Sequence, residues 1–302
     1  MAPRPAPPAT LTSLRNGLGT AADWLSNLAL RGLIGAILAL PYRTRVTAMG
    51  AVLRRVIGPA LGYRRRAEAN LAMIHPDMPA SERRRIADAV CDNFGRTLIE
   101  NYSWRDFGRH LAGTPIKGEG LAAVEEARAA GRPVIFVTGH FGNYEAPRQA
   151  LTARGYRIGG LYRPARNRFF NAHYARSMTE TSGPVFPQGH KGTFGFARHL
   201  KSGGMATILF DVRVIKSPRI PFLGKPALTS TSAADFALKF DALLVPYFGT
   251  RQPDGLSFEI EIERPIAHSD PLTMTTEMTR RLEARIARNP EQWFWIHRRW
   301  KP

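Results

Sequence analysis

Cysteine is almost absent from this sequence, with Cys91 as the single example among 302 residues. One thiol cannot form an intramolecular disulfide, and it cannot supply the several thiolates of a cysteine-based zinc site. The sequence therefore excludes a disulfide-stabilised scaffold and is compatible with a reducing compartment such as the cytosol. Cys91 falls in a predicted amphipathic helix, where we expect a buried structural thiol and not a covalent acyl carrier.

The N-terminal part of the chain lacks an uninterrupted apolar run. The stretch 24–42 is largely apolar, but Arg31 lies near its middle. A membrane-spanning helix needs about 20 mostly apolar residues, and a central arginine costs at least a few kcal/mol. We therefore expect a helix that lies in the membrane interface or dips into one leaflet, with a spanning helix as the alternative.

Acidic residues are scarce, with 24 Asp and Glu against 43 Lys and Arg and a formal net charge of +19. Such a charge predicts an anionic partner, namely phospholipid headgroups, a phosphorylated glycolipid, an acidic carrier protein or nucleic acid. Nucleic acid is the least favoured of these, because the chain shows no helix-turn-helix, zinc-finger or RNP signature. An arginine cluster after the apolar stretch favours anionic membrane lipids; its members are Arg54, Arg55, Arg64, Arg65 and Arg66.

The domain organisation follows from these composition changes. We expect residues 1–19 to form a disordered leader rich in Pro and Ala, and residues 20–66 to form a membrane-associated helical segment. Residues 67–302 are long enough for a single α/β domain with a sizeable core.

The segment from Gly120 onward alternates between strand and helix patterns. A helix over 81–104 precedes it, with an apolar stripe at near-helical spacing that we expect to pack in the core; the stripe contains Ile86, Val90, Phe94, Leu98 and Tyr102. Strands are predicted at 134–138, 158–162, 184–186, 205–210, 243–247 and 256–262, and helices at 121–130, 144–153, 171–181, 192–201, 231–240 and 275–287. This rhythm predicts a mixed, mostly parallel central sheet with helices on both faces.

A histidine and a glutamate follow the first buried strand of this pattern. His140 and Glu145 are spaced His-x4-Glu, and Gly139 and Gly142 flank the histidine in the turn. A carboxylate that reaches the imidazole Nδ1 fixes the tautomer and leaves Nε2 free to take a proton from a hydroxyl group. We therefore expect His140 to be a general base that activates an alcohol, with Glu145 as its supporting carboxylate.

Four sequence blocks in order along the chain resemble one enzyme family. These blocks are Thr138-Gly-His-Phe-Gly-Asn-Tyr-Glu145, Tyr162-Arg-Pro-Ala-Arg-Asn167, Ile220-Pro-Phe-Leu-Gly-Lys-Pro-Ala-Leu-Thr229 and Pro290-Glu-Gln-Trp-Phe-Trp-Ile-His-Arg-Arg-Trp-Lys301. They resemble motifs of the lysophospholipid acyltransferase superfamily, and specifically of its lipid A late-acyltransferase branch. One block departs from the pattern, because the chain reads Asp211-Val-Arg213 where the branch usually has Asp-Gln.

The resemblance implies a membrane-associated O-acyltransferase at the cytoplasmic face of the inner membrane. Its donor is a thioester of acyl carrier protein or coenzyme A, acting as a co-substrate, and its acceptor is a hydroxyl of a lipid A precursor. A lyso-glycerolipid or lyso-aminolipid acceptor is the alternative. The remote alternative is a noncatalytic basic protein that binds a membrane or nucleic acid. No metal site is expected, since the chain has no His-Glu-x-x-His pattern, and no nucleotide cofactor is expected, since it has no Walker or Gly-x-Gly-x-x-Gly sequence.

Further site residues are expected where strands end, because ligands bind α/β sheets at the carboxyl ends of their strands. Arg163, Asp211 and Arg251 follow strands as His140 does, so these four side chains are predicted to converge. The substrate-binding candidates are Gly142, Asn143, Arg163, Asp211 and Lys191. The amides around Gly142 and Asn143 are expected to stabilise the oxyanion of the reaction, and Arg163 and Lys191 to bind phosphate.

Overall fold

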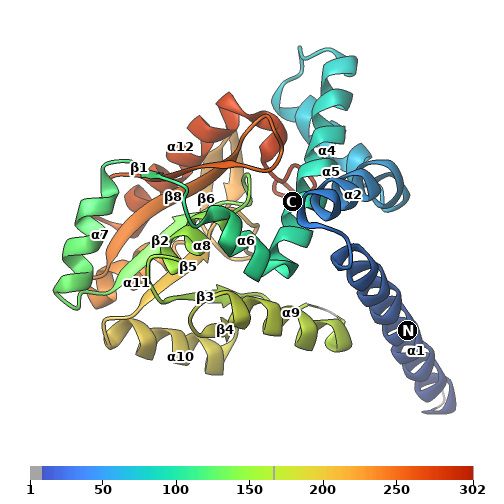
Figure 1. Ribbon diagram of the computed structural model, residues 1–302, viewed down its shortest axis with the longest axis horizontal. Helices are drawn as coiled ribbons and strands as arrows, with labels where there is room; N and C mark the ends of the chain where they lie inside the picture. The colour runs from blue at the N-terminus through green and yellow to red at the C-terminus, as the bar shows by residue number, and fades with distance from the viewer. Residues whose placement is uncertain (1–8, 166, 302) are drawn as a thin grey trace, which may run out of the picture.

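The computed structural model describes residues 9–165 and 167–301, and a seven-stranded sheet lies at its centre (Figure 1). The strands follow the order β1-β9-β8-β2-β5-β3-β4, and β8 and β9 form the one antiparallel pair of this sheet in the described residues. Their bounds are β1 Ile116–Lys117, β2 Val134–Thr138, β3 Ile158–Tyr162, β4 Val185–Pro187, β5 Met205–Leu209, β8 Leu243–Arg251 and β9 Phe258–Ile262. The predicted mixed, mostly parallel sheet is confirmed.

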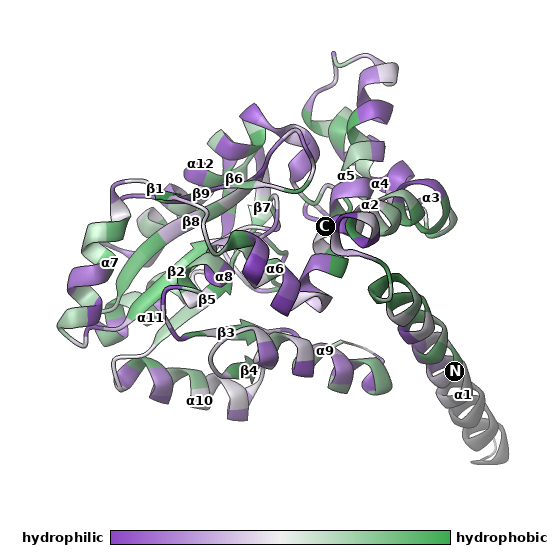
Figure 2. Cartoon of the chain, in the orientation of Figure 1, coloured by the Kyte–Doolittle hydropathy of each residue, from purple (hydrophilic) through white to green (hydrophobic). Residues whose placement is uncertain are grey.

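Helices cover both faces of the sheet, as the fully buried strand β2 requires. Its residues Ile135 and Val137 pack in one core with α5, α10, α11 and α12, while Val134 and Phe136 pack in a second core with α7 and α8. The helices are α5 Ala80–Tyr102, α6 Trp104–Leu111, α7 Gly120–Ala129, α8 Ala146–Thr152, α9 Arg168–Thr181, α10 His190–Lys201, α11 Ser232–Phe240 and α12 Pro271–Arg288. Figure 2 shows the central strands in hydrophobic colours between helices of mixed hydropathy, as burial on both faces predicts.

The N-terminal helices pack against α5 through a shared apolar cluster. Ile34 and Ile37 of α1 lie in this cluster with Val46 and Met49 of α2 and Ile99 of α5. The elements are α1 Ala9–Leu38, α2 Tyr42–Val52, the π-helix η1 Leu53–Ile57, α3 Gly58–Ala60 and α4 Tyr63–Ile74. Figure 1 shows α1 extending away from the sheet toward the N-terminus. The C-terminal end of α1 is therefore part of the folded core.

Part of the expected N-terminal leader is helical. Residues 1–8 of the leader predicted over 1–19 lie outside the described residues, and Ala9 begins helix α1. Among the described residues, no helix combines the length and the apolar character needed to cross a membrane.

The strand predictions are closest for two central strands of the sheet. The strands predicted at 134–138 and 158–162 have the bounds of β2 and β3. The antiparallel hairpin of β6 Arg219–Phe222 and β7 Lys225–Leu228 was not predicted. Pro221 and Pro226 face each other in it, and proline opposes a strand assignment except at sheet edges. Its turn needs positive φ at Leu223 and Gly224, a conformation that leucine rarely adopts.

Candidate active site

His140 and Asp211 lie side by side at the carboxyl edge of the sheet. Thr138 of β2 pairs with Leu209 of β5 in parallel register. His140 comes two residues after Thr138, and Asp211 comes two residues after Leu209. The distance from Asp211 Oδ1 to His140 Nδ1 is 2.7 Å. Asp211 Oδ2 also accepts hydrogen bonds from the His140 backbone amide at 2.8 Å and from Trp293 Nε1 at 2.9 Å.

These contacts determine the protonation of the pair. Burial alone would raise the pKa of the Asp211 carboxyl, but the charge of His140 and hydrogen bonds from His140 and Trp293 hold that pKa well below its ordinary value. Because the ionised carboxylate can only accept a hydrogen bond, the imidazole carries its proton on Nδ1. Its Nε2 bonds to no other residue in the part of the chain that the structure describes, so Nε2 is the free basic atom.

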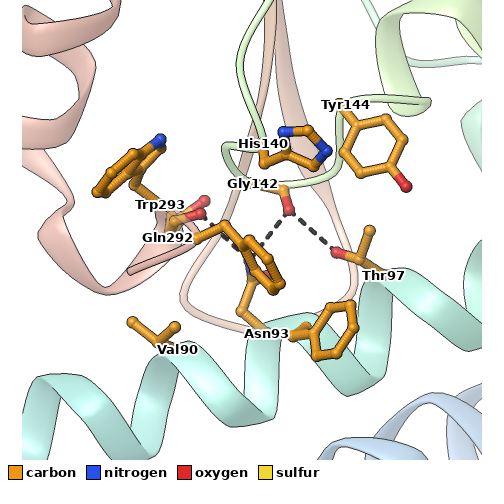
Figure 3. Close-up of a pocket in the computed structure, with 10 residues that line it drawn as sticks. Val90, Asn93, Thr97, His140, Gly142, Tyr144, Gln292 and Trp293 are labelled. Atoms are coloured by element: carbon orange, nitrogen blue, oxygen red, sulfur yellow. Dashed lines mark hydrogen bonds between the residues drawn. The ribbon is translucent and has the colours of Figure 1, made fainter. Parts of the chain in front are cut away.

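The His140 imidazole opens onto a small apolar cavity (Figure 3). The His140 ring lies between the rings of Tyr144 and Phe294, and its centroid is 5.4 Å from the Tyr144 centroid and 5.8 Å from the Phe294 centroid. The His140 side chain is 29% exposed. Val90, Asn93, Phe94 and Thr97 of α5 form another wall of the cavity. Its volume of about 50 Å³ holds a few waters, since one water needs about 10–15 Å³.

The apolar stripe of α5 lines two cavities beside the sheet. Ile86 and Val90 are buried, as expected for core packing. Phe94 borders the His140 cavity, and Leu98 and Tyr102 border a second cavity of about 40 Å³. The stripe therefore combines core packing with the lining of the site.

The carboxylate at Nδ1 of His140 is Asp211 and not Glu145, so the predicted contact of Glu145 with the imidazole is wrong. Glu145 is 9% exposed and accepts a hydrogen bond from Arg148 Nη1 at 2.9 Å. Arg148 is itself buried and also donates to the backbone carbonyls of Ile158 and Ser182. The physical reason is competition: an adjacent helical turn supplies Glu145 with a buried guanidinium, while β5 places Asp211 directly beside His140.

This buried ion pair gives Glu145 a predictable effect on stability. Glu145→Gln leaves the Arg148 guanidinium buried without a counter-charge, so the free energy of unfolding should fall by about 3 kcal/mol. Chemical denaturation measures this change. The matched control is Glu180→Gln, which breaks an exposed Glu–Arg pair with Arg176 and should have little effect. Equal effects at the two positions would contradict a structural role for the Glu145–Arg148 pair.

The amides of Gly142 and Asn143 are engaged, so their predicted role as oxyanion donors is wrong. Gly142 N donates to Gln292 O at 2.9 Å, and Asn143 N donates to Gly249 O at 3.1 Å. Gly142 has a φ of +54°, and a Cβ there would lie 1.9 Å from Gly249 O. Glycine is therefore required at position 142 by a close approach of backbone to backbone.

The Asn143 side chain binds protein groups. It is fully buried, donates to Glu100 Oε2 at 2.8 Å and accepts the amide of Glu145 at 2.9 Å. Arg251 binds the same Glu100 carboxylate with both Nη atoms, at 2.6 and 2.7 Å. Arg251 therefore lies in a buried ion pair with α5, and its predicted convergence with His140 is wrong.

Arg163 and Lys191 are exposed basic side chains. Arg163 follows β3 and lies close enough to His297 for its charge to lower the pKa of that imidazole. Lys191 lies in the first turn of α10. Neither side chain has an ion-pair partner in the described residues, so both remain available to an anionic ligand. Over residues 9–165 and 167–301, no group of three or more His, Cys, Asp or Glu side chains is placed to hold a metal ion.

The C-terminal segment contributes three residues to the site whose positions the sequence did not reveal. Trp293 is buried and binds Asp211, and the Phe294 amide donates to the His140 carbonyl at 3.0 Å. His297 Nε2 accepts the backbone amide of Arg213 at 2.9 Å. The signal for this segment in the sequence was the block 290–301, one of the four that resemble the family, and that block does not specify these contacts.

Comparison with known proteins identifies similar sequences along nearly the whole chain. A family model described as bacterial lipid A biosynthesis acyltransferase matches residues 12–302. The lipid A biosynthesis lauroyltransferase of Escherichia coli (strain K12) is 27% identical over 293 residues, which cover 92% of each chain. A lipid A biosynthesis acyltransferase of Haemophilus influenzae is 23% identical over 262 residues, covering 85% of this chain and 81% of the relative. Lipid A biosynthesis acyltransferase 2 of Shigella flexneri is 22% identical over 280 residues, covering 88% and 86%.

Proposed function

Because the chain belongs to the bacterial lipid A biosynthesis acyltransferase family, we propose that it transfers a fatty acyl chain from a thioester to a hydroxyl of a lipid A precursor. The observation that carries this proposal is the His140–Asp211 pair, with Nε2 free beside an apolar cavity. A base with an unoccupied Nε2 can take a proton from an alcohol, and an apolar cavity suits the end of a fatty acyl chain.

The reaction needs no nucleophile from the protein. Nε2 of His140 takes the hydroxyl proton as the acceptor oxygen attacks the thioester carbonyl, and a tetrahedral oxyanion forms. The oxyanion collapses, the carbon–sulfur bond breaks, and the leaving thiolate takes the proton back from the imidazolium. Asp211 stabilises the imidazolium and fixes its tautomer. Glu145 acts as a positioning residue, since its contact with Arg148 ties the start of α8 to the carbonyls of Ile158 and Ser182.

The donor is proposed to be an acyl thioester of acyl carrier protein, with coenzyme A as the alternative carrier. The formal charge of +19 suits an acidic carrier protein. The acyl chain is proposed to lie along the stripe of α5 between the two cavities, with Phe94 and Leu98 against it. The cavities must widen to admit a chain, because together they hold only a few waters.

The acceptor is proposed to be recognised through Arg163 and Lys191, which can bind phosphate. Arg163→Ala should raise the KM for a phosphorylated lipid A precursor by roughly 10- to 100-fold, since a charge-assisted hydrogen bond contributes about 1.5–3 kcal/mol. Steady-state kinetics with purified enzyme measures this effect. Arg264→Ala is the matched control, because Arg264 is exposed and pairs with Glu119 away from His140.

The departure at Asp211-Val-Arg213 favours testing a second acceptor class directly. Purified enzyme receives one acyl-carrier donor together with a lipid A precursor and a lyso-aminolipid at equal concentration. Mass spectrometry should find the acyl chain mainly on the lipid A precursor. Acylation of the aminolipid alone would overturn the lipid A assignment and leave the acyl-transfer chemistry in place.

Association with the cytoplasmic face of the inner membrane is part of this proposal. Trp24, Leu25 and Leu28 of α1 are 44–60% exposed, and Val56 and Leu61 are exposed beside Arg54 and Arg55. Apolar side chains next to cations suit an anionic lipid surface.

Point substitutions test this surface better than truncation, because Ile34 and Ile37 of α1 belong to the core. Replacing Trp24, Leu25 and Leu28 together by serine should lower binding to anionic vesicles by at least about 10-fold, since each buried apolar side chain contributes about 1.5–3 kcal/mol. Arg54→Glu with Arg55→Glu should weaken binding mainly at low salt. Full-length protein that does not sediment with anionic vesicles at low salt would contradict the proposal.

A further inference from the structure

The turn that carries His140 has few free donors for an oxyanion. The amides of residues 140–143 donate to Asp211, Gly139, Gln292 and Gly249, respectively. The amide of Glu145 donates to the Asn143 side chain. Within residues 140–145, the amide of Tyr144 alone has no partner among the described residues. The turn therefore offers one free amide at most, and any further donor to a tetrahedral oxyanion formed near Nε2 has to come from another segment.

His297 presents such a donor in a defined tautomer. Its Nε2 lies 2.9 Å from the backbone amide of Arg213, and an amide nitrogen can only donate. Nε2 is therefore unprotonated, and the ring proton is on Nδ1. No hydrogen bond to this Nδ1 is formed by the residues that the structure describes, and the side chain is partly exposed.

The imidazole of His297 is neutral at physiological pH. Burial lowers the pKa of His297 to about 4, and the neighbouring charges of His140, Arg299 and Arg163 act in the same direction, against Asp211. A neutral Nδ1–H donates a hydrogen bond without competing with His140 for the proton of the acceptor. Neutral imidazole is an effective electrophilic donor in other enzyme sites.

Two chain segments connect His297 to His140, whose charge is close enough to affect the pKa of His297. The first is 211–213, where Asp211 binds the His140 imidazole and the Arg213 amide binds His297. The second is the tail, where the Phe294 amide donates to the His140 carbonyl and the His297 amide donates to the Phe294 carbonyl, both at 3.0 Å. Both histidines are thus tied to the same two segments at the carboxyl edge of the sheet.

We propose that Nδ1–H of His297 donates a hydrogen bond to the thioester carbonyl oxygen as it becomes an oxyanion, which makes His297 a further catalytic residue. The inference rests on the proposed acyl transfer. His140 moves the proton in both steps, and His297 keeps its own proton throughout. The hydrogen bond strengthens as charge develops on the oxygen and weakens when the carbon–sulfur bond breaks.

Two substitutions separate this role from a purely structural one. His297→Asn places an amide N–H near the position of Nδ1 and loses the contact with Arg213. His297→Gln keeps an acceptor near the position of Nε2 for the Arg213 amide and loses the Nδ1 donor. A donor role therefore predicts that the Asn variant is the more active, whereas a structural role predicts that the Gln variant is.

The assay measures kcat and the KM values for an acyl-carrier thioester and a lipid A precursor, with thermal unfolding as a check on folding. His297→Gln and His297→Phe should lower kcat by about 10²- to 10³-fold with both KM values nearly unchanged, and His297→Asn should recover part of the loss. Arg163→Ala is the contrasting variant, whose effect should fall on the acceptor KM.

Three results would overturn the inference. A folded His297→Gln protein with near-normal kcat would place the donor elsewhere, for example at the Tyr144 amide. A loss confined to KM would make His297 a ground-state binding residue, and a Gln variant more active than the Asn variant would make its role structural. Absence of acyl transfer by the wild-type protein is a separate outcome, which would overturn the proposed function itself.

Discussion

His140→Ala is expected to lower kcat by about 10²- to 10⁴-fold while the protein stays folded. The variant removes the basic atom that faces the cavity, and none of the other described residues that line the cavity has a basic side chain. His297 cannot take over, because burial lowers its pKa to about 4 and its Nε2 already accepts the Arg213 amide. Transfer of a labelled acyl chain at saturating substrate measures the loss.

The fold of this variant should survive because His140 is peripheral to the main cores. Its side chain is 29% exposed and contacts the Tyr144 and Phe294 rings at the cavity. His75→Ala is the matched control, since His75 is exposed and is not part of the site. Near-normal turnover by folded His140→Ala protein would show that His140 is not the general base.

The sequence predicts the position of the site well because its signals are local. Strand β2 begins with the apolar run Val134 to Val137 and ends at Thr138, directly before Gly139 and His140, and both of its bounds are predicted. The expectation that polar residues after parallel strands converge is confirmed for His140 and Asp211. Such a pattern needs only the local period and the rule that parallel strands share a carboxyl edge.

The choice of carboxylate could not be predicted in the same way. Glu145 is near His140 in sequence, whereas Asp211 becomes its neighbour only because β2 and β5 are adjacent in the sheet. Strand order is a tertiary property that no local pattern records. The helical neighbour Arg148 then captures Glu145.

The wrong predictions for the Gly142 and Asn143 amides and for Arg251 also result from tertiary contacts. The amides of Gly142 and Asn143 are satisfied by Gln292 and Gly249, which belong to distant segments. Strand β8 continues past the predicted end at residue 247 because it pairs with β9 up to Arg251 and Phe258. Arg251 therefore reaches Glu100 on α5 and not the edge occupied by His140.

The active-site pairing itself makes the Asp211 carboxylate irreplaceable by an amide. Asp211 accepts from three donors, namely His140 N, His140 Nδ1 and Trp293 Nε1. Asparagine has one acceptor oxygen, which can satisfy the two donors that share Oδ2. Its NH₂ group then faces Nδ1, which must become an acceptor, so the imidazole proton moves to Nε2 and the base is lost.

The kcat of Asp211→Asn, compared with that of Glu145→Gln, tests the central claim most directly. Both proteins are assayed below their unfolding temperatures with an acyl-carrier thioester and a lipid A precursor at saturation. We expect Asp211→Asn to lose up to about 10⁴-fold in kcat, as when a triad carboxylate is replaced by its amide, and Glu145→Gln to lose much less. Near-normal kcat for Asp211→Asn together with a large loss for Glu145→Gln would contradict the account and would indicate that Glu145 is the carboxylate that supports the imidazole.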